Sequence, residues 1–111
     1  MKKPAEADAE EEGGDNLNLD SIGCTANVVV IDQGLKKIFV ANAGDSRCVM
    51  GVNGKCVPMS FDHKPESEVE LARITKAGSE VVEGRVDGNL NLTRAFGDLK
   101  YKQKKQFKPE E

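Results

Sequence analysis

Apolar residues are scarce in this chain, and they form no long run. They make up 38% of the 111 residues, below the roughly 45–50% usual for globular proteins, so we expect at most one domain with a thin core. No stretch approaches the ~18 consecutive apolar residues of a membrane span. The opening MKKPAEADAEEEGG also lacks the apolar stretch of a secretory signal. These absences favour an intracellular protein, cytoplasmic or nuclear, that has no membrane partner.

Paired cysteines are absent as well. Cys24, Cys48 and Cys56 are odd in number, and none belongs to a Cys-x-x-Cys pair, so the sequence supports neither a disulfide framework nor a zinc site. If Asn53-Gly54 forms a two-residue hairpin turn, Cys56 lies opposite Gly51 and cannot face Cys48. We expect the three thiols to be small buried hydrophobes in a reducing compartment.

Charge is unevenly placed along the chain, and its net value of −3 conceals this. Residues 1–20 form an acidic head with seven carboxylates: Glu6, Asp8, Glu10, Glu11, Glu12, Asp15 and Asp20. Residues 102–111 form a basic tail, and the lysines near that end are Lys100, Lys102, Lys104, Lys105 and Lys108. Both ends are first expected to be solvated and poorly ordered. The alternative is that the lysine-rich end contacts an acidic partner. Without interleaved aromatic residues, nucleic-acid binding is not expected.

Between these ends the sequence predicts strands, a helix and further strands. β-branched runs at 24–31, 36–43, 46–52 and 55–59 are separated by turn signals, which predicts an antiparallel meander. After the helix, a short strand around Val81-Val82, a turn at Asp87-Gly88 and an alternating strand over 89–94 are predicted. In that last strand, Leu90 and Leu92 share a face.

The helix is predicted at Glu68–Ala77. Ser67 and Glu70 have the spacing of a capping box at its start, and Gly78 stands where a helix stops. The helix has one apolar stripe, formed by Leu71, Ile74 and Ala77. It can therefore cover only one side of a sheet.

The stretch VANAGDSR, Val40 to Arg47, ends an apolar strand on a small-residue turn. Asp45 in that turn is either a turn residue, which caps backbone groups or pairs with Arg47, or a hard oxygen ligand for a cation. Asp beside Gly is common in turns, so the turn interpretation is favoured on this stretch alone.

Five strings in order carry a family resemblance: GCTANVVVI, VANAGDSRCV, DHKPESEVELARI, AGSEV and GRVDGNLNLTRAFGD. Together they resemble the middle of the metal-dependent protein phosphatases, the type 2C serine/threonine phosphatases, over about residues 21–101. The acidic run before DSIGCTA makes the gamma-like members the most similar. The resemblance implies an α+β fold: this chain would be the central part of a two-sheet antiparallel β-sandwich with flanking helices.

The resemblance also implies chemistry. Two Mg²⁺ or Mn²⁺ ions would activate a water that hydrolyses phosphoserine and phosphothreonine in proteins. Asp45 would be a ligand of an additional, weaker metal site. No catalytic residue is assigned here, because the family's phosphate-clamping arginine, its Asp-Gly-His-Gly-Gly string and its late Asp ligands have no counterparts. The isolated chain is therefore expected to be inactive, and its partners are phosphoprotein substrates and the missing parts of the same catalytic domain.

Three further residues are candidates near the substrate. Residues 66–85 resemble the family's flap, a small element beside the active site, or are simply a packed surface helix. Arg85 and Arg94 are cations that could approach a phosphorylated substrate, although Arg94 could instead pair with Asp98 four residues later. His63 stands in a loop and is favoured as a structural residue over an acid–base catalyst. The alternative function is a non-catalytic interaction module with an exposed sheet edge.

Overall fold

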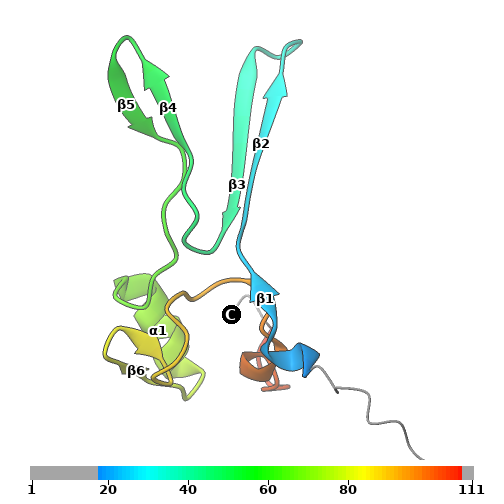
Figure 1. Cartoon of the computed structure of the whole chain (residues 1–111), viewed down its shortest axis with the longest axis vertical. Coiled ribbons are helices and arrows are strands. Elements are labelled where there is room, and N and C mark those ends of the chain that lie inside the picture. The colour runs from blue at the N-terminus through cyan, green and yellow to red at the C-terminus, as the bar shows by residue number, and fades with distance from the viewer. Residues whose placement is uncertain (1–17, 109–111) are drawn as a thin grey trace, which may run out of the picture.

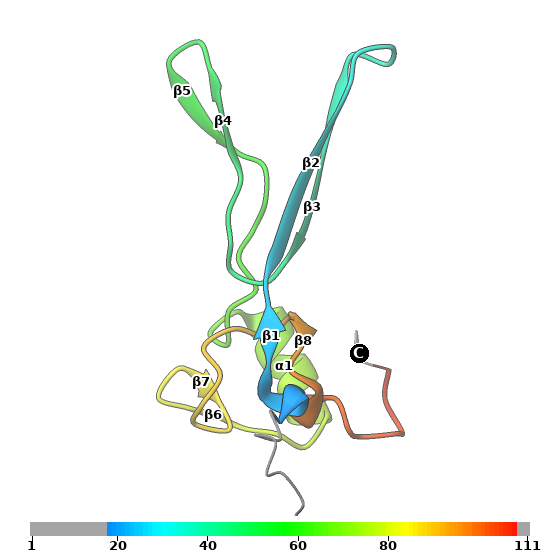
Figure 2. The ribbon, with the colours of Figure 1, turned by 45° about the vertical axis from the view of Figure 1, so that its right-hand side comes forward.

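Two β-hairpins form the most regular part of the protein. The computed structural model describes residues 18–108. Strand β2 (Ala26–Asp32) pairs antiparallel with β3 (Lys37–Ala43), and β4 (Val49–Val52) pairs antiparallel with β5 (Lys55–Pro58). Both hairpins extend from one base, which holds the remaining elements (Figures 1 and 2).

The turns of both hairpins follow from the residues in them. Asn53 and Gly54 have φ of 48° and 74°, the positive values that a two-residue turn of this kind requires. The turn sets Gly51 opposite Cys56, as predicted. In the first hairpin, Asp32 Oδ1 accepts the N–H of Leu35 at 2.8 Å, which closes the turn in the way typical of Asp.

The predicted meander is wrong in one respect, because β3 and β4 do not pair with each other. Each hairpin is a separate two-stranded sheet. The segment between them instead binds the chain that follows β5: the N–H of His63 donates to Gly44 O at 2.9 Å, and the N–H of Cys48 donates to Ser60 Oγ at 2.8 Å. These contacts direct β4 away from β3.

Both faces of the first hairpin are open to solvent. Val29, Val30 and Ile31 are 45%, 54% and 67% exposed, and successive strand residues point to opposite faces. The expectation of buried thiols is also wrong here, because Cys24 and Cys56 are exposed and Cys48 is half-buried. No second layer among residues 18–108 covers these strands.

Helix α1 (Glu68–Lys76) ends one residue before the predicted boundary. Gly78 has a φ of 78°, and the N–H groups of Gly78 and Ser79 donate to the carbonyls of Thr75 at 2.9 Å and Ile74 at 3.1 Å. This pair of hydrogen bonds is the Schellman arrangement, which a glycine at this position favours. The predicted stop at Gly78 is confirmed.

The predicted capping box at the start of α1 is wrong. Ser67 makes no side-chain capping hydrogen bond. Glu70 does not reach back to it, because its carboxylate binds Arg73, Arg94 and Thr93. The helix start is instead preceded by a backbone turn in which Ser67 N–H donates to Lys64 O at 3.1 Å.

Short elements complete the base. They are η1 (Leu19–Ser21), β1 (Gly23–Cys24), β6 (Val81–Val82), β7 (Arg85–Val86), β8 (Phe96–Gly97) and η2 (Leu99–Tyr101). β1 pairs with β8 and β6 with β7, both antiparallel. Among the described residues, no helix has the length and apolar character needed to cross a membrane. Residues 1–17 of the acidic head and 109–111 of the basic tail lie outside the described range.

The core of the base is as thin as the composition predicts. Ile74 of α1 and Val86 of β7 are each 6% exposed and are the buried hydrophobic residues of the described chain. The predicted strand over 89–94 is wrong: only an isolated bridge joins Leu90 to Val86 across the Asp87-Gly88 turn. The turn therefore forms as predicted, but the chain beyond it leaves the sheet to meet α1.

The exposed hairpins predict that the isolated 111-residue chain self-associates. Uncovered strand edges and apolar faces pair with other copies, so light scattering at micromolar concentration should report species larger than a monomer. A V29K/I31K variant should scatter less, because charge blocks this pairing, whereas K36Q at the hairpin tip should not. A cooperative thermal transition of a monomer would contradict the prediction.

Candidate functional site

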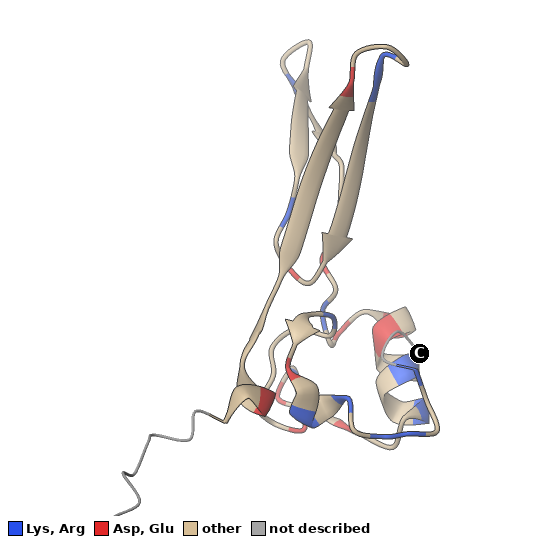
Figure 3. Cartoon of the chain, turned by 90° about the vertical axis from the view of Figure 1, so that its right-hand side faces the viewer, with Lys and Arg blue, Asp and Glu red and all other residues tan. Residues whose placement is uncertain are grey.

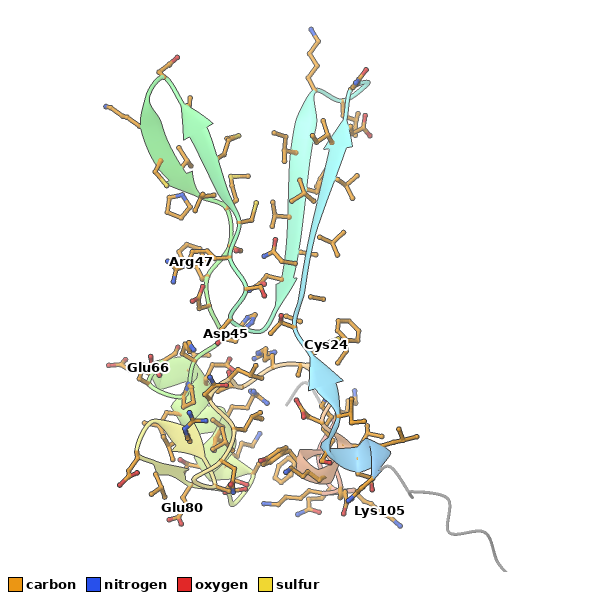
Figure 4. All side chains as sticks on the ribbon, in the orientation of Figure 1. Cys24, Asp45, Arg47, Glu66, Glu80 and Lys105 are labelled. Atoms are coloured by element: carbon orange, nitrogen blue, oxygen red, sulfur yellow. The ribbon has the colours of Figure 1, made fainter. Side chains whose placement is uncertain are left out.

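Asp45 lies at the junction between the hairpins and the base (Figure 4). It follows Gly44, which is buried and has a φ of 112°. A Cβ at that position would lie 2.4 Å from Thr25 Cγ2, so both the backbone conformation and the close approach require glycine. Thr25 and Ser46 also share a hydroxyl hydrogen bond of 2.7 Å. The turn is thus held against the residue that precedes β2.

Half-buried amide groups and one buried hydroxyl fix the bases of the two hairpins to one another. Asn27 Nδ2 donates to Asn42 Oδ1 at 2.9 Å and to Ser60 Oγ at 3.2 Å. Ser60 is 6% exposed and accepts the N–H of Cys48. A network in which these polar groups find partners favours a single arrangement of the chain, so the position of Asp45 follows from its surroundings.

The carboxylate of Asp45 forms an ion pair with Lys64. Lys64 Nζ lies 2.6 Å from Asp45 Oδ2, and the two side chains are 32% and 23% exposed. The hydrogen bond to Asp45 raises the pKa of Lys64. Arg47, which the sequence offered as a partner, instead binds Asp62 through two hydrogen bonds of 2.9 and 2.8 Å. That fork lowers the pKa of Asp62.

The donors around Asp45 are too few to hold a divalent metal by themselves. Mg²⁺ takes about six oxygen ligands, and residues 18–108 contain no cluster of three or more His, Cys, Asp or Glu side chains suited to a metal. Asp45 supplies one carboxylate, and an ammonium group already faces it. The residues of the described chain therefore fit an incomplete site, so any metal held there takes its other ligands from elsewhere.

His63 supports the turn at Gly44 through two hydrogen bonds. Its Nδ1 accepts the N–H of Gly44 at 3.0 Å, and its backbone N–H donates to Gly44 O. Because Nδ1 is an acceptor, the neutral ring carries its proton on Nε2. The backbone carbonyl of His63 accepts the N–H of Thr93 at 3.1 Å. His63 therefore joins the Asp45 turn to the 93–94 segment.

Glu70 is the charged centre of the base. It is 4% exposed, and its carboxylate accepts hydrogen bonds from Arg94 at 2.8 Å, Arg73 at 2.8 Å and Thr93 at 2.7 Å. Burial by itself raises its pKa, but the hydrogen bonds from Arg94, Arg73 and Thr93 outweigh it and lower the pKa from 4.5 to about 2. Arg94 therefore pairs with Glu70 rather than with Asp98.

The structure brings together some of the predicted site residues and not others. Asp45 follows Gly44 in the chain, and His63 accepts a hydrogen bond from the Gly44 N–H. The backbone of Arg94 lies close to Gly44, because its carbonyl oxygen would be 3.0 Å from a Cβ placed there. The guanidinium of Arg94 binds Glu70 instead. Arg85 is exposed and donates to Asn89 O at 2.8 Å within its own turn.

Two residues of the site escaped the sequence analysis, namely Lys64 as the partner of Asp45 and Glu70 as a buried anchor. Glu70 had a usable signal, because Arg73 follows it at the i, i+3 spacing of a helical ion pair. Lys64 had none, since it lies 19 residues from Asp45 and no periodic pattern connects them.

A model of the protein phosphatase 2C family matches residues 2–110. The chain belongs to this family. A crystal structure of a phosphatase from a pathogenic strain of Toxoplasma gondii aligns with a TM-score of 0.58 and 28% identity, covering 81% of this chain and 39% of that one. These findings confirm the expected resemblance and the α+β fold of a protein phosphatase 2C.

Two relatives show how much of a protein phosphatase 2C this chain represents. It is 53% identical to human protein phosphatase 1G over 112 aligned residues, covering all of this chain and 19% of the relative. It is 56% identical to protein phosphatase 2C homolog 2 of Aspergillus fumigatus over 89 residues, covering 80% of this chain and 20% of the relative. The match to protein phosphatase 1G supports the gamma-like resemblance. The chain spans about a fifth of each relative's length.

Replacing Glu70 should destabilise the folded base. In the intact protein, E70Q leaves two guanidinium groups without their counter-charge, which should lower the free energy of unfolding by about 3 kcal/mol. The control is E68Q on the exposed side of the same helix, which should change it by about 0.5 kcal/mol or less. Chemical denaturation measures both. Equal effects of the two variants would contradict the role of Glu70.

The lowered pKa of Glu70 also predicts that the folded protein loses stability at acid pH. Its contribution to stability is complete above pH 4.5 and is lost as pH falls toward the folded pKa of about 2. The difference in unfolding free energy between the intact wild-type protein and E70Q should therefore shrink across this interval. A difference that stays constant from pH 6 to pH 2.5 would show that the charge of Glu70 is not what stabilises the base.

Proposed function

We propose that this chain is the central part of the catalytic domain of a metal-dependent protein serine/threonine phosphatase. The substrates are phosphoserine and phosphothreonine in intracellular proteins, cytoplasmic or nuclear, and the cofactor is Mg²⁺ or Mn²⁺. One observation carries the proposal: all of this chain matches protein phosphatase 1G, at 53% identity. The remaining metal ligands and the other parts of the β-sandwich come from residues outside this chain.

Asp45 contributes one oxygen ligand to an auxiliary cation in this proposal. When bound, the family's metal ions activate a water for attack on phosphorus. The chain's own residues prepare the ligand: Gly44 allows the tight turn, His63 holds it, and Lys64 balances the charge of the carboxylate. The position of Asp45 is thus set before any cation arrives, which lowers the cost of binding one.

The segment 66–85 and its neighbouring arginines serve the substrate in the same proposal. Arg85 is exposed and near the end of the segment that resembles the flap, where a guanidinium can meet a phosphorylated or acidic protein. Arg94 has 32% of its side chain exposed while it binds Glu70. It therefore acts mainly by fixing the segment between the helix and the Asp45 turn.

A non-catalytic interaction module is the second candidate function. It is favoured by the Asp45–Lys64 ion pair, which neutralises the carboxylate without any metal. The exposed apolar side chains of the β2–β3 hairpin, such as Ile31 at 67%, would then be the surface that a partner covers.

Activity assays distinguish the two functions. The intact protein should hydrolyse a phosphothreonine peptide with Mn²⁺ and lose this activity with EDTA, whereas the isolated 111-residue chain should show no metal-dependent turnover of a small phosphate ester. Turnover by the isolated chain that EDTA abolishes would show that the metal ligands are complete within it. An inactive intact protein would favour the interaction module.

Substituting Asp45 in the intact protein tests its assignment as a ligand. D45N keeps the shape of the side chain but removes the charge that attracts a cation. We expect the Mn²⁺ activation curve to move to higher concentration with little change in melting temperature, because the ion pair with Lys64 is partly exposed. D62N, which breaks the pair with Arg47, is the control and should leave the activation curve in place. A lower melting temperature with an unchanged curve would make Asp45 a turn residue only.

A further inference from the structure

The chain that follows η2 folds back onto the end of α1 and forms a basic surface there. We call this surface the basic cradle and define it by Arg73, Lys76, Lys102 and Lys104. Its walls include the rings of Tyr101 and Phe107. In Figure 3, blue Lys and Arg segments mark the helix and the short elements of the base, while long stretches of both hairpins carry no charge.

Specific contacts build the cradle, so it is more than a solvated run of lysines. Lys76 Nζ lies 5.7 Å from the centroid of the Phe107 ring, a cation–π distance. Lys104 Nζ donates to Ala77 O at the end of α1, where the helix dipole favours a cation. Lys102 Nζ donates to Ala95 O at 2.6 Å. These contacts hold the tail against the end of α1 and against the segment at Ala95.

The cradle has more positive charge than the described residues around it neutralise. Four ion pairs occur among residues 18–108, and none of them involves Lys76, Lys102 or Lys104. Arg73 binds Glu70 through Nη2, but its Nε is buried and has no hydrogen-bond partner in the described chain. A buried donor without a partner and several unneutralised ammonium groups call for an anionic ligand.

We propose that the acidic segment 6–15 of the same chain docks on the basic cradle. Six of its ten residues are acidic and none is basic: Glu6, Asp8, Glu10, Glu11, Glu12 and Asp15. This is the charge complementarity that the cradle requires. The segment is tethered to the base, so its effective concentration at a site within reach is of millimolar order, well above that of most free acidic partners.

The topology places the start of the described chain beside the cradle. η1 contacts η2, Gly23 is paired with Gly97, and the N–H of Asp98 donates to Ile22 O at 2.8 Å. Because η2 leads directly into Lys102, the acidic segment joins the base next to the basic tail. Ten extended residues span up to about 33 Å, which is ample for a neighbouring surface.

Carbodiimide cross-linking of the full-length protein that carries this sequence tests the proposal. The reagent joins carboxylates to amines that are already in contact, and mass spectrometry identifies the linked residues. We expect links from residues 6–15 to Lys102 or Lys104 in the monomer. Their yield should fall on the order of tenfold between roughly 0.01 M and 1 M salt, where the screening length drops from about 30 to about 3 Å. Lys36, Lys37 and Lys55 at the hairpin tips are the internal reference and should link far less.

Variants and isotope labelling complete the test. E10Q/E11Q/E12Q should lower several-fold the cradle links made by the unchanged carboxylates Glu6, Asp8 and Asp15, while the control variant E80Q/E83Q should not. In a mixture of isotope-labelled and unlabelled protein, the links should stay within one copy. Links between copies, equal yields at the hairpin tips, or an absence of cradle links at low salt would each overturn the proposal.

Discussion

The arrangement of the base depends on one buried carboxylate, that of Glu70. It is shared by two guanidinium groups and a hydroxyl, and these come from both α1 and the 93–94 segment. Thr93 also donates its N–H to His63, which in turn holds Gly44. Because a buried charge is costly unless it is paired, the helix and this segment cannot separate freely. The Asp45 turn is therefore positioned by a series of contacts that begins at Glu70.

The hairpins contrast with the base, because hydrogen bonds define them while little packing covers them. The run Val28–Ile31 is apolar on every residue, a pattern typical of strands buried on both faces, yet these side chains are exposed here. The pattern is typical of a strand with a covering layer on each face, and residues 18–108 supply no such layer. This agrees with a chain that spans about a fifth of its relatives' length.

Turn and helix-stop residues predicted the local structure well. Contacts between segments far apart in the sequence could not be predicted from such residues. Asn53-Gly54 and Gly78 each impose a backbone conformation by themselves, so the hairpin turn and the helix stop were predicted from sequence. The capping box failed because Glu70 had stronger partners about 23 residues away. The predicted strand over 89–94 does not form, because Thr93 and Arg94 bind Glu70 of α1 instead of a neighbouring strand. The candidate ligand Asp45 came from the family resemblance, and its partner Lys64 only from the structure.

The two carboxylates Glu70 and Asp45 show how burial decides a role. Both face cations, but Glu70 is 4% exposed and has three donors, whereas Asp45 has one ammonium and a side chain that is 23% exposed. Displacing the arginines would leave buried charges unpaired, so the Glu70 cluster is fixed. Displacing Lys64 only returns a half-exposed ammonium to water, which costs little. Of the two, Asp45 is therefore the carboxylate with the more easily displaced partner, as its proposed role as a metal ligand requires.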